Sequence, residues 1–350
     1  MIHKKTLAAV AAISVAGLAA CSAPASNTNP GGSGSSTTSG GSTGPQTMAV
    51  DPAAKGPAKE IDGAVKGGNM LIRAESTPST MDPTNIYYTD SNEIGKLTFR
   101  ALTQFDIRDG KPILVPDLAE DLGTVSADKL TWTFKLKKGI KYQDGTEVKA
   151  ADYAYAIKRS FAHDIFKDGP PYQLEYFKDG DTYKGPYAST ADYTGVETPD
   201  EQTLVIHLKK PFADLPFYAS FPMFTPIPQA KDTKQNYQNN PMTTGPYMWD
   251  SFNISSELKL KKNPNWDPAT DPVRHQYVDT WQFKWGADAV TTQKQTLLSQ
   301  GPDAASIEYD AVDATLIPDI MNGKQSQLIS GESPCTIVFQ MDTRKIPLEV

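Results

Sequence analysis

Residues 22–47 contain only Ser, Ala, Pro, Asn, Thr, Gly and Gln. Because a segment of this composition has no large apolar side chains to bury, it is predicted to stay flexible and to form no part of a core. We extend this linker over residues 21–68, so that the part of the chain that can fold begins near Asn69. As a flexible coil the linker would span roughly 35–40 Å, from ~5–6 Å × √n.

Residues 1–20 have the pattern of a signal peptide. Lys4 and Lys5 form a short basic region, and the apolar run Leu7–Ala20 follows it. This run is too short to cross a bilayer, which needs ~20 apolar residues, but it suits the core of a signal peptide. It ends in Leu-Ala-Ala-Cys, which resembles a bacterial lipoprotein box. We therefore expect cleavage before Cys21, lipidation of its thiol, and a protein anchored at the extracytoplasmic face of the cell membrane. The alternative is an ordinary secretory signal with a coincidental cysteine.

The composition of the whole chain excludes several classes of protein. Hydrophobic residues make up 39% of the 350 residues and charged residues 21%, which is typical of neither a polytopic membrane protein nor a disordered chain. The net charge of −7, without a basic tract, argues against nucleic-acid binding. The two cysteines, Cys21 and Cys335, are too few for a disulfide framework.

Sequence motifs for catalysis, cofactors or metals are missing. His163, His207 and His275 stand in none of the spacings that bind zinc, and one late cysteine cannot complete a zinc site. No glycine motif of the P-loop or dinucleotide-binding type occurs. We therefore predict a binding protein without cofactor or metal, and not an enzyme. An extracytoplasmic hydrolase stays the alternative, because spacing in sequence cannot show which carboxylates meet in space.

The body beyond Asn69 is predicted to alternate short strands with helices. Residues 130–136 alternate apolar and polar side chains, which is the pattern of a strand with one buried face. A capping box at 90–93 is expected to open a helix that carries Ile94, Leu97 and Leu102. Further strands are expected at 70–74, around Val196, at 204–208, in two stretches after Tyr247 and at 278–285, and further helices at 150–161 and 287–299. This order predicts an α/β body.

Several stretches of this body, in order, resemble the signature of a known family. The first group is Pro116–Leu122, Leu130–Lys137 and Gly139–Val148, and the others are Ala150–Tyr153, Thr244–Tyr247 and Leu260–Trp266. Together they closely resemble the family 5 solute-binding proteins, which are the peptide-binding components of ABC importers.

The resemblance implies a fold and a way of working. Members have a periplasmic-binding-protein-like α/β fold (type II, cluster C), in which two lobes joined by a hinge clamp the ligand. Lobe one would comprise residues 69–334, with a core domain at about 69–100 and 230–334 and an inserted domain at about 101–229. The implied partners are a peptide, bound largely through its main chain, and the permease and ATPase subunits of an importer. The same fold also binds nickel chelates and oligosaccharides and occurs in signalling relatives, so these remain alternatives.

By the same resemblance, two aromatic segments are expected to contact the ligand. Tyr87, Tyr88 and Thr89 occupy the positions at which the oligopeptide binders touch the ligand backbone. Tyr87 stands where those proteins have a glutamate, which leaves the ligand class open. Tyr172 and Tyr176 lie in a stretch that resembles a second segment facing the cleft. The alternative is a surface loop whose tyrosines pack on the core.

The end of the chain resembles the point at which family members cross into lobe two. Residues 334–342 resemble the crossing strand, so residues 335–350 are expected to form the hinge and the start of lobe two. Because family members continue well beyond this point, lobe two is expected to be mostly truncated. In the oligopeptide-binding relatives the cysteine that matches Cys335 forms a disulfide with a partner from lobe two, which this sequence does not contain.

Overall fold

The structure, a computed structural model, describes residues 48–188, 192–298 and 306–328. The predicted signal peptide, most of the predicted linker and the expected hinge lie outside these residues, and with them Cys21 and Cys335. Across the described ranges, none of the helices combines the length and the apolar character that crossing a bilayer requires.

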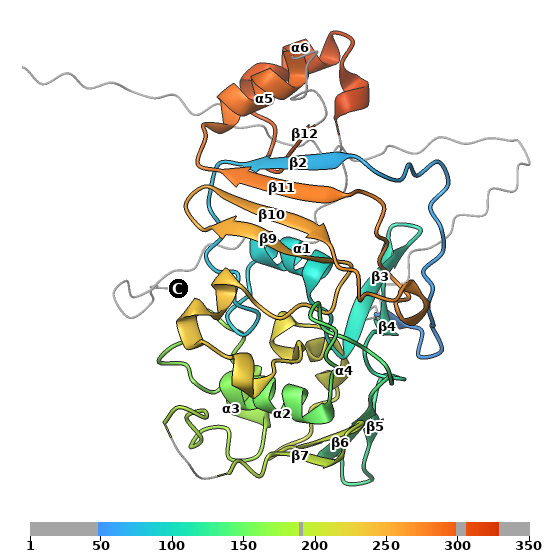
Figure 1. Cartoon of the computed structure of the whole chain (residues 1–350), viewed down its shortest axis with the longest axis vertical. Coiled ribbons are helices and arrows are strands. Elements are labelled where there is room, and N and C mark those ends of the chain that lie inside the picture. Colours follow the sequence, from blue (N-terminus) through green and yellow to red (C-terminus); the bar gives the residue numbers. More distant parts are fainter. Residues whose placement is uncertain (1–47, 189–191, 299–305, 329–350) are drawn as a thin grey trace, which may run out of the picture. The chain divides into compact units, whose positions relative to one another are not determined.

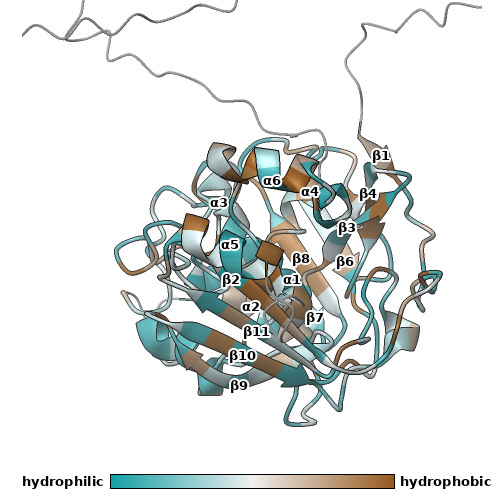
Figure 2. Ribbon diagram, turned by 90° about the horizontal axis from the view of Figure 1, so that it is seen from above, coloured by the Kyte–Doolittle hydropathy of each residue, from teal (hydrophilic) through white to brown (hydrophobic). Residues whose placement is uncertain are grey.

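One sheet of the body has five strands, which come from both the beginning and the later half of the described residues (Figure 1). Its strand order is β12 (Ser306–Glu308), β2 (Asn69–Ala74), β11 (Thr280–Trp285), β10 (Glu257–Lys262) and β9 (Tyr247–Asn253). Strands β11 and β12 run parallel to β2, whereas β10 is antiparallel to both of its neighbours. Along β10 the alternation of apolar and polar residues is visible in Figure 2. Leu258 and Leu260 are fully buried, so the predicted strands of this region are confirmed.

Helix α1 (Thr89–Thr98) packs on one face of this sheet, where Ile94 joins a core that contains Trp249 and Trp285. The helix differs from the prediction at both ends. It begins at Thr89 with Tyr88 as the N-cap and without a side-chain cap, so the expected capping box does not form. It ends before Leu102 because the backbone is already extended at Phe99.

A four-stranded sheet carries the predicted alternating strand. Its order is β5 (Thr124–Val125), β6 (Thr131–Lys135), β8 (Thr203–His207) and β7 (Val196–Asp200). Trp132 and Phe134 of β6 are buried against α2 (Ala150–Arg159), which contributes Tyr153 and Ile157 to the same core. The strands and the helix predicted here are confirmed. Two short helices, α3 (Tyr172–Tyr176) and α4 (Leu215–Tyr218), lie at the border of this core.

Residues 48–68 differ from the flexible linker expected for them. Strand β1 (Ala49–Val50) pairs in parallel with β4 (Lys111–Pro116), which is the middle strand of a three-stranded sheet completed by β3 (Thr103–Arg108). Asp51 then pairs with Arg108 at 2.7 Å, and the hydroxyl of Tyr277 donates to Glu60 over 2.8 Å. Because these contacts are made by backbone and charged groups, the hydrophobic pattern of the sequence does not reveal them.

The remaining described elements are short or lie near β12, which is an edge strand of the five-stranded sheet. Helix α5 (Ala289–Leu298), close to the predicted range, packs with α6 (Ile317–Met321) through Leu297, Leu316 and Ile320. The 3-10 helices are η1 (Pro222–Phe224), η2 (Gln229–Lys231), η3 (Lys234–Asn239), η4 (Pro268–Thr270), η6 (Ala314–Leu316) and η7 (Gln325–Gln327).

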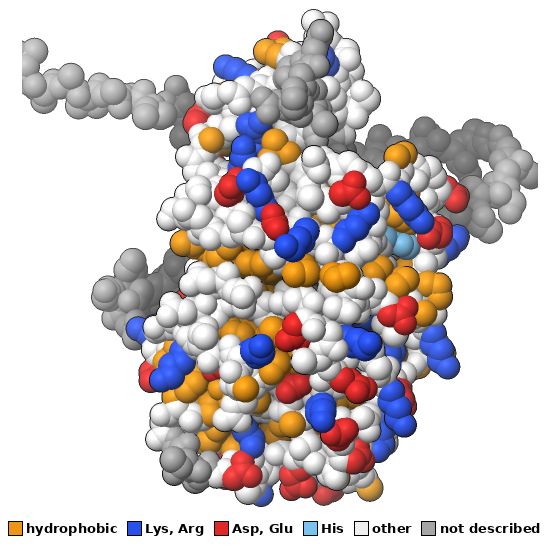
Figure 3. All heavy atoms as spheres, in the orientation of Figure 1, with side chains coloured by type: hydrophobic (Ala, Val, Ile, Leu, Met, Phe, Trp, Pro, Cys, Tyr) orange, Lys and Arg blue, Asp and Glu red, His pale blue; other side chains and the backbone are white. Residues whose placement is uncertain are grey.

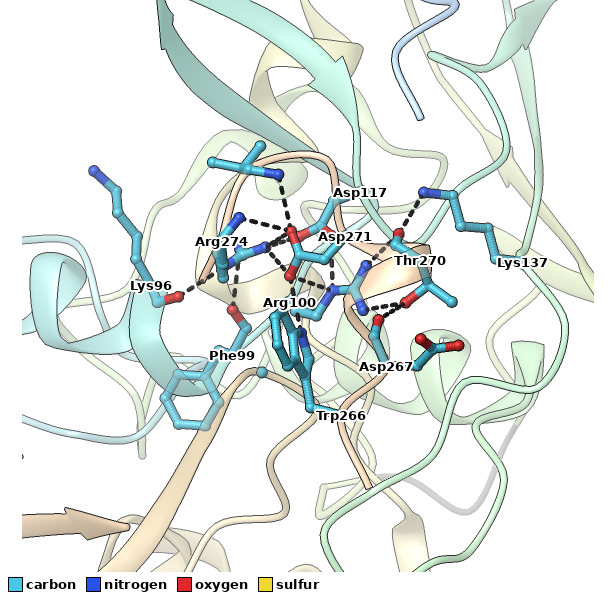
Figure 4. A network of polar contacts seen from close by, with 12 residues as sticks. Lys96, Phe99, Arg100, Asp117, Lys137, Trp266, Asp267, Thr270, Asp271 and Arg274 are labelled. Carbon is cyan, nitrogen blue, oxygen red and sulfur yellow. Dashed lines mark hydrogen bonds and ion pairs between the residues drawn. The ribbon is translucent and has the colours of Figure 1, made fainter. Parts of the chain in front are cut away.

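Arg100, Asp117, Asp271 and Arg274 form a buried group that we call the charge tetrad (Figure 4). Asp117 accepts from Arg100 Nε and from Arg274 Nη1, each over 2.8 Å. Asp271 pairs with Arg274 at 3.2 Å and accepts from the indole Nε1 of Trp266 over 3.1 Å. Two positive and two negative charges balance, so the tetrad joins distant segments without a net buried charge.

Charged side chains of both signs are interspersed on the face of the molecule drawn in Figure 3. Along the outer face of β10, Lys259 pairs with Glu257 at 3.2 Å and Lys261 pairs with Asp250 at 3.0 Å. Exposed pairs of this kind contribute ~0–1 kcal/mol each, so they are a solvated surface rather than a source of stability.

Candidate ligand-binding surface

Tyr87, Tyr88, Tyr172 and Phe221 come together in space, and we call them the aromatic surface. The hydroxyl groups of Tyr87 and Tyr172 are 3.2 Å apart and share a hydrogen bond. The ring of Tyr87 stacks on that of Phe221 with a centroid distance of 5.8 Å, and Tyr88 meets Tyr87 edge to face at 6.4 Å. The fold therefore brings Tyr87 and Tyr88 of one predicted ligand segment beside Tyr172 of the other.

The three tyrosines of the aromatic surface remain open to solvent. Tyr87 is 41% exposed, Tyr88 56% and Tyr172 38%. Large aromatic rings that stay exposed side by side are uncommon on a protein with no further contact to make. The hydrogen bond to Tyr172, with a smaller effect of burial, raises the pKa of Tyr87 above its ordinary value. The hydroxyl of Tyr87 thus stays protonated at neutral pH, and the surface presents flat rings with polar edges.

A buried layer supports the aromatic surface from beneath. Tyr218, at the end of α4, is 3% exposed and contacts the rings of Tyr172 and Phe221 with centroid distances of 5.2 and 5.6 Å. Its hydroxyl donates to the side-chain oxygen of Gln173 over 2.6 Å. Because this layer is packed and its polar groups are satisfied, the exposed rings rest on a rigid base.

The other two residues predicted to touch the ligand have different surroundings. Thr89 is exposed as the first residue of α1, directly after Tyr88. Tyr176 is half-buried and stacks on Phe212 with a centroid distance of 4.1 Å, while Lys210 lies over its ring at 4.4 Å. The two tyrosines of the 171–176 stretch therefore have different surroundings. Tyr172 lies on the aromatic surface, whereas Tyr176 packs against the core.

Phe221 belongs to the aromatic surface but was not predicted from the sequence. It lies among the aromatic residues of the 212–224 stretch, most of which are buried. A dense run of aromatic residues is the signal that could have drawn attention to this stretch. Which of them stays at the surface depends on the turn between α4 and η1, and this cannot be read from the order of residues.

A separate cavity of about 410 Å³ lies between α1 and the five-stranded sheet. Its wall is mainly apolar and includes Ile72, Trp281 and Phe283, and Asp90, Glu93 and Asp310 add acidic groups. None of the predicted ligand residues lines it. Within the described ranges no group of three or more His, Cys, Asp or Glu side chains could hold a metal ion.

Residues 114–349 match the family model described as bacterial extracellular solute-binding proteins, family 5 Middle. The chain belongs to this family, as the sequence signature predicted, and the periplasmic-binding-protein fold is confirmed with it. The family is one of binding proteins rather than enzymes.

Curated relatives include glutathione-binding proteins. The protein GsiB of Escherichia coli strain K12 is 28% identical over 284 residues, which cover 80% of this chain and 49% of that protein. The GsiB of Escherichia coli O6:K15:H31 (strain 536 / UPEC) is 29% identical over 196 residues, covering 55% of this chain and 34% of its own length. The chain thus spans about half, or less, of the curated relatives it matches.

Solved structures with the same fold include peptide-binding proteins. The clavulanic acid biosynthesis oligopeptide binding protein 2 has a TM-score of 0.64 and 31% identity, and the match covers 71% of this chain and 46% of that one. The Listeria monocytogenes OppA bound to peptide has a TM-score of 0.59 and 20% identity, with 73% and 48% covered. The second likeness shows the fold alone.

Proposed function

We propose that this chain captures peptides outside the cytoplasm and delivers them to the permease and ATPase subunits of an ABC importer. A lipid on Cys21 would hold it at the extracytoplasmic face of the cell membrane. Membership of family 5 supports the binding role. In this proposal the core and inserted domains, expected at 69–100 with 230–334 and at 101–229, form one lobe of a clamp that closes on the ligand.

The observation that carries the proposal is the exposed aromatic surface. Tyr87, Tyr88 and Tyr172 come from two segments that the family resemblance independently assigns to the ligand. Rigid aromatic rings give a large contact area at a small entropic cost, and their hydroxyls can bond to main-chain groups of a peptide. Recognition through the main chain suits ligands of varied sequence.

Glutathione is a second candidate ligand. The curated relatives named above are glutathione-binding proteins, and glutathione is itself a short peptide-like molecule. Tyr87, Tyr88 and Tyr172 carry no positive charge that could pair with a ligand carboxylate. The aromatic surface therefore favours a ligand whose charged ends do not contact these three residues. Titration calorimetry with glutathione and with a mixed peptide library separates the two candidates.

The test replaces Tyr87 and Tyr88 together by alanine. We expect binding to weaken by ~1–3 kcal/mol, which is the scale of an interface anchor, with little change in melting temperature because neither ring lies in the core. A Tyr309→Ala variant is the matched control, since this tyrosine is 47% exposed and lines the separate cavity. Unchanged affinity in the double variant, or a loss only in the control, would remove the aromatic surface from the proposed site.

A further inference from the structure

Arg159, the last residue of α2, is fully buried and holds the loop that leads to Tyr87. Its Nη1 and Nη2 donate to the two carboxylate oxygens of Asp82 over 2.5 and 2.6 Å, and Nη1 also donates to the hydroxyl of Thr84. On the other side, Nε pairs with Asp232 at 3.2 Å and Nη2 donates to the carbonyl of Lys234 over 2.9 Å. Every nitrogen of the guanidinium therefore has a partner.

The groups around Arg159 suit the charge and the planar, forked shape of its guanidinium. Burial acts to raise the pKa of Asp232, but the charge of Arg159 and the hydrogen bonds that Asp232 accepts from Tyr155, Tyr187 and the backbone of Lys234 together outweigh it, so the pKa lies below its ordinary value. Asp232 also accepts from the hydroxyl of Tyr155 over 2.6 Å, and the ring of Phe166 lies 3.9 Å from the guanidinium carbon. A planar guanidinium satisfies such an arrangement, whereas the ammonium of lysine has only three donors and no fixed fork.

The same loop is held from the side of α3. The side-chain oxygen of Asn85 accepts from the backbone N–H groups of Asp168 and Gly169 over 2.9 and 3.1 Å. Gly169 approaches the loop so closely that a Cβ placed there would lie 2.5 Å from the carbonyl oxygen of Thr84. Three residues after Gly169 the chain reaches Tyr172. Asn85 thus joins the loop with Tyr87 directly to the segment that leads to Tyr172, whereas Arg159 joins the same loop to the end of α2 and to residues 232–234.

We propose that Arg159 is a positioning residue that sets the geometry of the aromatic surface by fixing the loop 82–88 to the end of α2. Arg159 itself is buried and touches no part of that surface. This inference rests on the proposed function for its biological meaning, but the geometry can be tested without any ligand. Loss of the fork would release the loop, and the hydroxyl of Tyr87 would separate from that of Tyr172.

The phenol of Tyr87 reports on this geometry directly. In ring-labelled protein its NMR titration, assigned with a Tyr87→Phe variant, should give a pKa above the ordinary value of 10.0 because of the hydrogen bond to Tyr172. In an Arg159→Lys variant we expect that pKa to return toward 10.0. Arg100→Lys is the matched control, since Arg100 is 1% exposed and lies in the charge tetrad instead. It should lower stability while leaving the titration of Tyr87 unchanged.

Each result decides the proposal. An unchanged Tyr87 titration in folded Arg159→Lys, or an equal shift in Arg100→Lys, would overturn it. If Arg159→Lys does not fold, an Asp82→Asn variant weakens the same fork from the side of the loop and should shift the titration in the same direction, and no shift would again overturn the proposal. If the titration shifts and peptide binding weakens roughly tenfold, the positioning role and the proposed function both stand. If the titration shifts while peptide binding is unchanged, the positioning role stands and the proposed binding surface fails.

Discussion

Replacing Asp117 by alanine tests whether the charge tetrad is a major source of stability. Asp117 follows β4 directly and its side chain is fully buried. It accepts one hydrogen bond of 2.8 Å from each of two arginines, whose side chains are 1% and 7% exposed. Its removal would leave Asp271 as the one carboxylate of the tetrad facing both guanidinium groups. The tetrad would then carry an uncompensated positive charge away from water.

The magnitude follows from this burial. Removing one partner of a buried ion pair costs about 3–5 kcal/mol, because the remaining charge loses its partner and cannot regain its hydration. Two charge-assisted hydrogen bonds at about 1.5–3 kcal/mol each lead to a similar figure. Since a domain is stable by only about 5–15 kcal/mol, Asp117→Ala should lose a large part of the free energy of unfolding.

Urea unfolding at neutral pH measures this loss. The control is Glu201→Ala, which removes an ion pair with Lys149 of similar length, 2.6 Å. In this pair the side chain of Lys149 is 50% exposed and that of Glu201 63%. We expect the control to lose less than ~1 kcal/mol, because water and salt already screen such a pair. A double variant with Arg274→Met restores the charge balance and should lose less than the sum of the two single variants.

A loss for Asp117→Ala that is no larger than the loss for Glu201→Ala would refute the reasoning. The tetrad would then be a group of contacts that water replaces without cost. Exact additivity in the double variant would show that Asp117 and Arg274 do not act as a pair. Both outcomes can be read from urea midpoints, provided that the slope of the transition stays the same.

Three further predictions concern acid stability, the membrane anchor and the half-buried tyrosine. Burial acts to raise the pKa of Asp271, but Arg100 and Arg274 outweigh it and hold the folded-state pKa below the ordinary 3.8. As the pH falls below about 3.8, the unfolded chain therefore binds a proton at Asp271 before the folded protein does, and the free energy of unfolding should decrease. An Asp271→Asn variant should flatten this pH dependence of the urea midpoint. Cys21→Ser should prevent lipidation and either release the protein into the medium or leave it as an uncleaved precursor, and equal incorporation of labelled fatty acid in variant and wild type would contradict this. Tyr176→Ala removes the ring that stacks on Phe212 and should lower the free energy of unfolding by about 1–2 kcal/mol. Calorimetry should show an unchanged ligand affinity for this variant.

Local patterns in the sequence determined most of the regular structure. Alternating residues predicted β6 and β10, and helical spacing predicted α2, because these patterns record which side chains of one element face the core. The signature between residues 116 and 266 identified the family for a related reason, since turns such as Asp144-Gly145 need particular residues. Gly145 has a φ of +85°, which a residue with a side chain rarely adopts.

The candidate surface was only partly visible in the sequence. The family resemblance drew attention to Tyr87, Tyr88, Tyr172 and Tyr176, but it could not show that Tyr172 meets Tyr87 while Tyr176 stacks on Phe212. Both tyrosines lie on the same short helix, and their surroundings differ because the 212–221 stretch places Phe212 beside Tyr176 but Tyr218 and Phe221 beside Tyr172. Phe221 joined the surface for the same reason.

Contacts between charged residues far apart in the chain were decided by the tertiary structure alone. Arg159 and Asp82 are 77 residues apart, and Arg274 and Asp117 are 157 apart. In a sequence such residues have the composition of an exposed surface, because charged side chains are seldom fully buried unless they are paired. Their pairing depends on where loops from different segments meet, and hydrophobic periodicity carries no record of it. The same limit explains residues 48–68, whose ionic and backbone contacts with the body leave no apolar pattern behind.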